Sequence, residues 1–205
     1  MPKGMERRSI NAEFRVVEKE GELPQIVGYA AKFNTFSEEM WGFREQIAPG
    51  AFTEALKDAD VRGLFNHDPN LILGRTKAGT MTLEEDSVGL KYTITPPDTQ
   101  MARDLIESIR RGDINQSSFA FSMAGGKEQW EEKKDGTVIR TLIQVGGLYD
   151  VSPVTYPAYG DTESGVRTAK QVFQEHQEER KKASPEAKAP DFLIERARMA
   201  LMEIE

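Results

Sequence analysis

The sequence predicts a mainly β protein of the α+β class, in which short strands are covered by one or two helices. Two observations support this prediction. Most of the first 168 residues form short runs of β-branched and aromatic residues, separated by segments rich in Gly, Pro, Asn and Asp. Within that range only one segment has the apolar spacing of a long amphipathic helix.

The composition limits the size of the core and the kinds of partner. The chain has 205 residues, of which 38% are hydrophobic, and this suffices for one core of ordinary domain size. The formal net charge of -7 disfavours nucleic acid and anionic membranes as partners. There is no apolar run of bilayer length, and the start "MPKGMERRSI" lacks a secretory signal segment, so we expect a soluble, intracellular protein.

The N-terminal half contains three predicted hairpins. The first joins "AEFRVV" to "QIVGYAAKF" through the turn segment "KEGELP", and a Pro-Gly turn and a short helix follow in "IAPGAFTEALKDAD". The second lies in "DVRGLFNHDPNLILGRT", where we expect Asp68 and Pro69 to break the run because proline cannot donate to a strand ladder. The third is "GTMTLEEDSVGLKYTIT", with a polar tip.

The C-terminal half begins with the clearest helix, "DTQMARDLIESIRRGD", which Asp98 or Thr99 can cap and Gly112 ends. A strand in "NQSSFAFS", a hairpin around "KKDG" and a last strand in "LYDVSPVTY" follow. From residue 169 onward, charge runs alternate with Ala and Pro. We therefore expect a domain over residues 1–168 and a charged, partly helical tail over 169–205, with a flexible joint near 183–190.

Several catalytic chemistries are disfavoured by the residues present. Cysteine is absent, which removes disulfides, thiolate nucleophiles and zinc ribbons. The two histidines, His67 and His176, lie in no HExxH-type helix, so a site with several histidine ligands is not expected, while a carboxylate-only magnesium site stays open. No G-x-S-x-G elbow of an α/β-hydrolase is present. We expect no cofactor.

The two adjacent serines of "NQSSFAFS" must face opposite ways if the segment is a strand, because successive side chains alternate. Ser117 then shares a face with Phe119 and Phe121, which is the expected core side. Ser118 shares a face with small and polar residues, where an extended substrate has room. A serine needs a neighbouring base to become a nucleophile, and His67 at a strand end suits this role better than His176 in the charged tail.

Six blocks occur in the order seen in the prohead maturation proteases of tailed bacteriophages, and the chain resembles that family over about residues 5–168. The blocks are "GYAAKFN", "FREQIAPGAF", "FNHDPNLILGRT", "GTMTLEEDSVGL", "IRRGDINQSSFAFS" and "LYDVSPVTYPAY". The resemblance implies a serine peptidase with a fold similar to herpesvirus assemblin, a closed or partly closed β-barrel with covering helices. It also implies scaffold segments of the major capsid protein as substrate, inside the assembling prohead in the host cytoplasm.

The resemblance places three site residues. His67, before the Asp-Pro pair, matches the family's base; Ser118, before "FAF", matches its nucleophile; and Asp150 matches the acidic position before Ser-Pro-Val-Thr. Asp150 would orient the imidazole of His67. Asp68 is the alternative acid, although neighbouring side chains on an extended backbone diverge, so a turn-forming role suits it better.

Other roles remain open on sequence grounds. Asp150 could instead pair with Arg75, and Arg75 could orient an oxyanion donor or serve as a surface residue. Ser152 lies beside Pro153 and suits a supporting strand. The apolar stripe that includes Leu193 and Leu201 could bind scaffold or capsid helices, and "ASPEAKAP" offers a site for self-cleavage. The chain could also self-associate, or it could be a catalytically inert assembly protein that keeps the protease fold.

Overall fold

The computed structural model describes residues 4–156, apart from 12, 13, 19 and 22, and residues 168–183. The chain divides into two compact units, Met1–Ala169 and Lys170–Glu205. The joint expected near residues 183–190 and the apolar stripe with Leu193 and Leu201 fall almost wholly outside the described residues. In the described part of the chain, no helix is long and apolar enough to cross a membrane.

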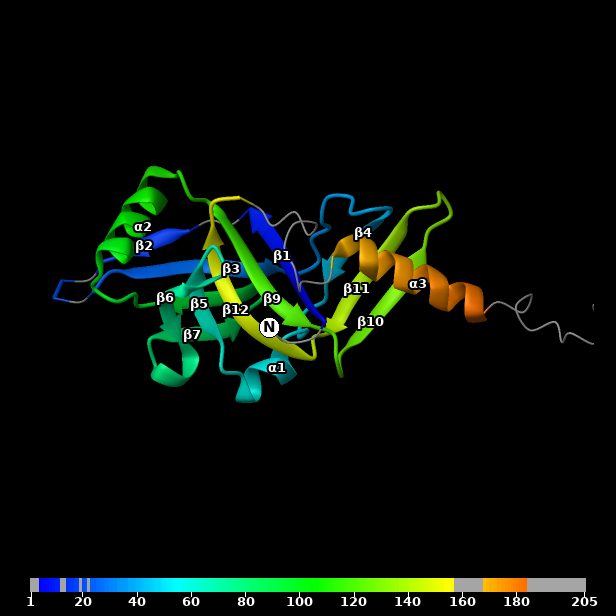
Figure 1. The fold of residues 1–205 in the computed structure, drawn as a ribbon, viewed down its shortest axis with the longest axis horizontal. Helices are drawn as coiled ribbons and strands as arrows, with labels where there is room; N and C mark the ends of the chain where they lie inside the picture. The colour runs from blue at the N-terminus through cyan, green and yellow to red at the C-terminus, as the bar shows by residue number, and fades with distance from the viewer. Residues whose placement is uncertain (1–3, 12–13, 19, 22, 157–167, 184–205) are drawn as a thin grey trace, which may run out of the picture. The chain divides into compact units, whose positions relative to one another are not determined.

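A five-stranded sheet forms the centre of the first unit (Figure 1). Its strands in spatial order are β1 (Met5–Asn11), β9 (Gln116–Ser122), β12 (Gly147–Val154), β5 (Arg62–Phe65) and β6 (Asp68–Arg75). β9 is antiparallel to both β1 and β12, whereas β12 runs parallel to β5. The strand that carries the two serines is therefore hydrogen-bonded on both sides, which fixes its register.

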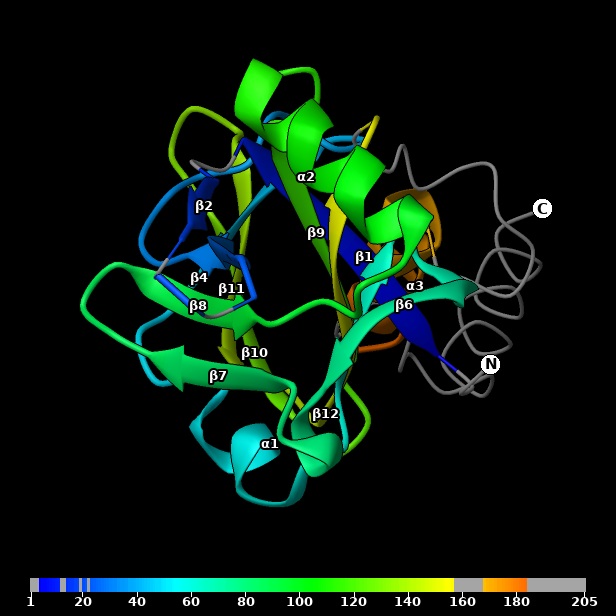
Figure 2. The ribbon, with the colours of Figure 1, turned by 90° about the vertical axis from the view of Figure 1, so that its left-hand side faces the viewer.

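A second sheet packs against one face of the first. It has four strands, in the order β2 (Arg15–Val17), β3 (Gln25–Lys32), β8 (Gly89–Ile94) and β7 (Met81–Glu85), and Figure 2 shows β7 and β8 side by side. The core between the sheets includes Phe119 and Phe121 of β9, Tyr92 of β8 and Ile26 of β3. The rings of Phe119 and Phe121 stack at 5.1 Å between centroids, so the odd-numbered residues of β9 face this core.

A third sheet has the order β10 (Lys127–Glu132), β11 (Val138–Gln144) and β4 (Phe43–Ile47), with β11 and β4 parallel. The expected closed or partly closed barrel is not found: each of the three sheets in the described residues is open, with two edge strands. One edge of the central sheet is β6, which contains Pro69 and pairs with β5 through two register shifts. A proline and bulges suit an edge strand and hinder further pairing.

The helices agree well with the expected positions. α1 (Thr53–Asp58) follows Phe52, whose buried ring packs edge-on against Phe119. α2 (Gln100–Arg111) begins after Thr99, which accepts a hydrogen bond from the backbone of Ala102, and ends at Gly112 in the left-handed conformation. α2 lies next to β2 (Figure 1). A 3₁₀ turn, η1, covers Thr76–Ala78, and α3 covers Ala169–Ala183.

A buried network of charges joins the third sheet to β1. Arg140 on β11 is fully buried, and its guanidinium contacts Glu6 of β1 at 2.7 Å and Glu45 of β4 at 2.8 Å. Arg8 contacts the same two carboxylates, and Glu128 of β10 also binds Arg140. Burial lowers the pKa of Arg140, but Glu45, Glu6 and Glu128 together more than reverse this effect and raise it. The Arg140 guanidinium therefore keeps its positive charge in this buried position.

We predict that Arg140→Ala lowers the free energy of unfolding by about 3–5 kcal/mol, because it leaves the buried carboxylates Glu6 and Glu45 with only one of the two cations that they share. Urea unfolding followed by circular dichroism measures the loss. Arg103→Ala is the matched control, since Arg103 forms an ion pair with Asp98 on the surface of α2, and it should hardly move the midpoint. Equal midpoints for the two variants would show that the buried network does not hold the sheets together.

Candidate active site

β9 presents its two central serines to opposite faces of the central sheet. Ser117 faces the core, where its hydroxyl lies 3.3 Å from the hydroxyl of Tyr92, and burial raises the pKa of that tyrosine. Ser118 lies on the other face, with Ala120 and Ser122, as the alternation of a strand requires. Both hydroxyls are fully buried, so each depends on a neighbouring group to satisfy its hydrogen bonds.

His67 is held at the tip of the β5–β6 hairpin. Phe65 pairs with Asp68, so Asn66 and His67 form a two-residue turn, and both have positive φ, 54° and 57°. This is the backbone geometry that type I′ hairpin turns require, and Asn and His adopt it more readily than most residues. Asp68 and Pro69, which we expected to break the run, do not do so: they begin the edge strand β6, where a missing donor costs little.

Asn66 fastens this turn to the end of β12. Its backbone N–H donates to the carbonyl of Pro153 at 3.0 Å. Its side-chain amide donates to the Thr155 hydroxyl at 3.1 Å, and its side-chain oxygen accepts from the Thr155 backbone at 2.8 Å. Sequence reasoning missed this role, although an Asn at the first turn position is a common signal of a type I′ hairpin. The contacts hold the neighbouring His67 over the central sheet.

The structure brings together His67, Ser118 and Asp150, which lie on three different segments. His67 Nε2 is 2.7 Å from Ser118 Oγ, and His67 Nδ1 is 2.5 Å from Asp150 Oδ1. An ionised carboxylate can only accept hydrogen bonds, so Nδ1 carries the proton and Nε2 has the lone pair. Nε2 can therefore accept the hydroxyl proton of Ser118. This is the arrangement in which imidazole acts as a base and a carboxylate fixes its tautomer.

Two further side chains lie close to Asp150. Ser152 donates to Asp150 Oδ1 at 2.9 Å from the same face of β12. Arg7 of β1 pairs across the ladder with Ala120, which in turn pairs with Asp150. Burial lowers the pKa of Arg7, and the charge of Asp150 opposes this shift. The aspartate therefore has a hydroxyl donor and a buried cation nearby.

The alternatives raised by the sequence lie elsewhere. Asp68 accepts from the backbone and side-chain amides of Asn70, as in an Asx turn. Arg75 binds Asp60 at the surface through two hydrogen bonds and lowers the pKa of Asp60 to about 2. Arg75 thus pairs with Asp60, while Asp150 contacts His67. His176 lies on α3, in the second unit.

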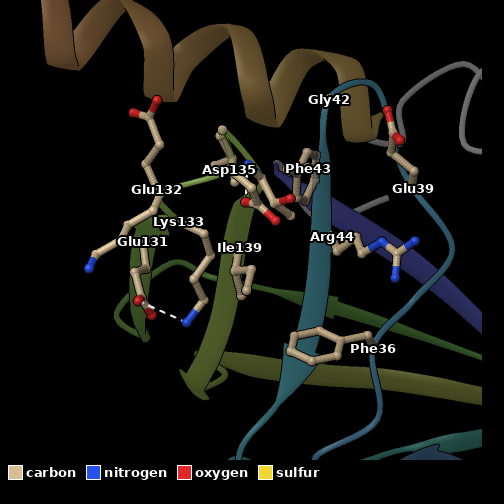
Figure 3. A pocket seen from close by; sticks show the side chains of 14 residues that line it. Phe36, Glu39, Gly42, Phe43, Arg44, Glu131, Glu132, Lys133, Asp135 and Ile139 are labelled. Atoms are coloured by element: carbon tan, nitrogen blue, oxygen red, sulfur yellow. Dashed lines mark hydrogen bonds and ion pairs between the residues drawn. The ribbon is translucent and has the colours of Figure 1, made fainter.

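The candidate site is closed in this structure. Ser118 has no exposed surface, and His67 and Asp150 are each only 7% exposed. A large cavity of about 1320 Å³ lies elsewhere, between the loop that precedes β4 and the β10–β11 hairpin (Figure 3). Phe36, Arg44 and Ile139 are among its lining residues, and the three candidate residues are not. No cluster of His, Asp and Glu able to hold a metal ion occurs in the parts of the chain that the structure describes.

Comparison with known proteins identifies the family. The family model for the caudovirus prohead serine protease matches residues 11–179. The chain belongs to this family. Prohead serine proteases act in bacteriophage capsid maturation, and the match extends over β9, β12 and the β5–β6 hairpin, which carry the three candidate residues.

Two further comparisons give less information than the family model. Among solved structures, the capsid assembly protease of bacteriophage T4 matches this chain with 13% sequence identity and a TM-score of 0.43. The match covers 74% of this chain and 99% of that one. Likeness at this level gives no information about the site. No curated protein matches the sequence significantly.

We predict that Asn66→Ala destabilises the protein by about 1–2 kcal/mol, because it removes two hydrogen bonds and puts alanine at positive φ. Asn66→Gly keeps the turn conformation but loses the side-chain bonds, so its loss should be smaller. Chemical denaturation measures the loss of stability in both variants. Asn70→Ala, on the exposed start of β6, is the control and should change stability little. Equal stability of all three variants would show that the turn does not depend on Asn66.

Proposed function

We propose that the protein is a serine endopeptidase that cleaves the scaffold segment of the major capsid protein, and also itself, inside the assembling prohead. The observation that carries this proposal is the hydrogen-bonded series Ser118–His67–Asp150 in a chain of the prohead serine protease family. The family supports a capsid protein as substrate and an assembling capsid in the host cell as the place of action.

The reaction follows from the positions of the three groups. Ser118 Oγ attacks the scissile carbonyl while His67 Nε2 takes its proton, and Asp150 stabilises the imidazolium that forms. His67 then gives the proton to the leaving amine, which leaves an acyl group on Ser118. Water, activated by the same imidazole, attacks this ester and releases the acid, so Ser118 and His67 return to their starting states.

The burial of Ser118 requires a change before a polypeptide can bind. A peptide carbonyl must come within contact distance of Ser118 Oγ, and that atom belongs to a fully buried side chain. We therefore infer that the groups around the site move aside when substrate binds, a step common among enzymes with covered sites. The same burial is the one observation that favours the alternative function, an inert assembly protein that retains the fold. Reactivity of Ser118 distinguishes the two.

We predict that a fluorophosphonate probe labels the wild-type protein at Ser118. Ser118→Ala should abolish labelling, and His67→Ala should slow it by at least about 10³-fold, because the hydroxyl loses its base. Ser117→Ala is the control, since its hydroxyl faces the core, and it should still be labelled. Peptide mass spectrometry locates the adduct. A folded wild-type protein that is never labelled, even when expressed with its capsid protein, would support the inert alternative.

We predict that the wild-type protein removes part of its own tail beyond residue 183, whereas Ser118→Ala keeps the full mass. The segment "ASPEAKAP" is the expected region of cleavage because it is rich in small and turn-forming residues. Intact-mass spectrometry over time measures the loss. If Ser118→Ala loses the tail at the wild-type rate, another protease is responsible.

A further inference from the structure

Ser152 lies at the site but has no part in the bond-making steps described above. It is fully buried on β12 and pairs directly with Ser118 across the β9–β12 ladder. Its hydroxyl donates to Asp150 Oδ1 at 2.9 Å and lies 3.4 Å from His67 Nδ1. A buried hydroxyl in a strand often bonds to backbone, so its contact with the carboxylate that binds His67 needs an explanation.

We propose that Ser152 is a positioning residue that orients Asp150 toward His67; this inference rests on the proposed peptidase function. Asp150 Oδ1 accepts hydrogen bonds from both His67 Nδ1 and Ser152 Oγ. The two donors approach the same oxygen from different elements, the hairpin turn and β12. Together they restrict rotation of the carboxylate, whose terminal torsion is otherwise soft. A fixed carboxylate holds the imidazole with Nε2 directed at Ser118.

Ser152 is not placed to act as a second nucleophile. Its hydroxyl hydrogen is used in the bond to Asp150, and it lies near His67 Nδ1, the nitrogen that carries a proton. Ser118 instead lies at Nε2, which has the lone pair. The two serines are neighbours across the ladder and contact opposite ends of the same imidazole. Ser118 therefore supplies the reacting oxygen, and Ser152 holds Asp150, which orients the base.

The site also explains why a hydroxyl, and not a methyl group, occupies position 152. Removal of the hydroxyl leaves Asp150 with one donor fewer in a buried environment, and a buried carboxylate with fewer donors is held less firmly and is less stable as an anion. Thr keeps the hydroxyl and suits a strand. Cys fills nearly the same space as Ser, but its thiol is a weak donor. These two substitutions separate the hydrogen bond from the packing.

The test compares full-length wild type with Ser152→Ala, Ser152→Cys and Ser152→Thr in the rate of labelling by a fluorophosphonate probe. Ser152→Ala and Ser152→Cys should slow labelling by about 10- to 100-fold, the range expected from the loss of one hydrogen bond to a carboxylate. Ser152→Thr should recover most of the rate. Ser122→Ala is the matched control. Ser122 is a buried serine on the same face of β9 as Ser118, and its hydroxyl contacts Tyr149. It should label as wild type does.

A second measurement tests the positioning itself. The His67 Nδ1 proton, observed by proton NMR and assigned by its absence in His67→Ala, should shift upfield and exchange faster in Ser152→Ala and Ser152→Cys, because its bond to Asp150 weakens. Ser152→Thr should keep the wild-type signal. Unchanged labelling and an unchanged proton signal in folded Ser152→Cys would overturn the inference, and Ser152→Cys decides the case if Ser152→Ala does not fold.

The two proposals fail in different ways. If labelling is absent in wild type or persists in Ser118→Ala, the peptidase function fails, while the proton signal still reports whether Ser152 orients Asp150. If wild type is labelled at Ser118 but Ser152→Ala and Ser152→Cys are labelled equally fast, only the role of Ser152 fails.

Discussion

The pairing of β9 with β12 is the constraint on which the rest of the site depends. β9 is hydrogen-bonded on both sides, so its register cannot slip without breaking two ladders. That register sets Ser118 opposite Ser152 and Ala120 opposite Asp150. The odd-numbered residues of β9 at the same time supply aromatic rings to the core between two sheets. A one-residue slip would therefore bury Ser118 in the core and turn Phe119 toward His67.

Local patterns in the sequence predicted the elements whose residues follow a simple period. The apolar stripe of α2 and the opposite faces of Ser117 and Ser118 follow from spacing alone, and the residue types left the cap between Asp98 and Thr99, of which the structure uses Thr99. The contact of His67 with Ser118 and Asp150 could not be derived in this way, because these residues are far apart in the chain and no local rule specifies which strand ends meet. Resemblance to a family suggested the three residues, and the geometry shows that they lie in contact.

Physical reasons explain why sequence reasoning missed some of the elements. β1 and β4 have no apolar alternation, because Glu6, Arg8 and Glu45 point inward and are neutralised by one another and by Arg140. A charged residue in a strand is read as exposed unless its partners are known, and those partners come from distant segments. The turn was expected near Pro69 because proline is a strong local signal, yet the preference of Asn66 for positive φ prevailed. The barrel expectation failed because β6 remains an open edge.

The position of β12 in the central sheet has a consequence for the order of events during synthesis. β12 is the last strand of the first unit to leave the ribosome, yet it lies between β9 and β5 and is the only strand that pairs with both in the described residues. Until it is inserted, the β5–β6 hairpin that carries the His67 imidazole has no ladder joining it to β9, which carries the Ser118 hydroxyl. The contact between Ser118 and His67 can therefore form only once translation has passed β12, and a nascent chain or an N-terminal fragment without β12 lacks it.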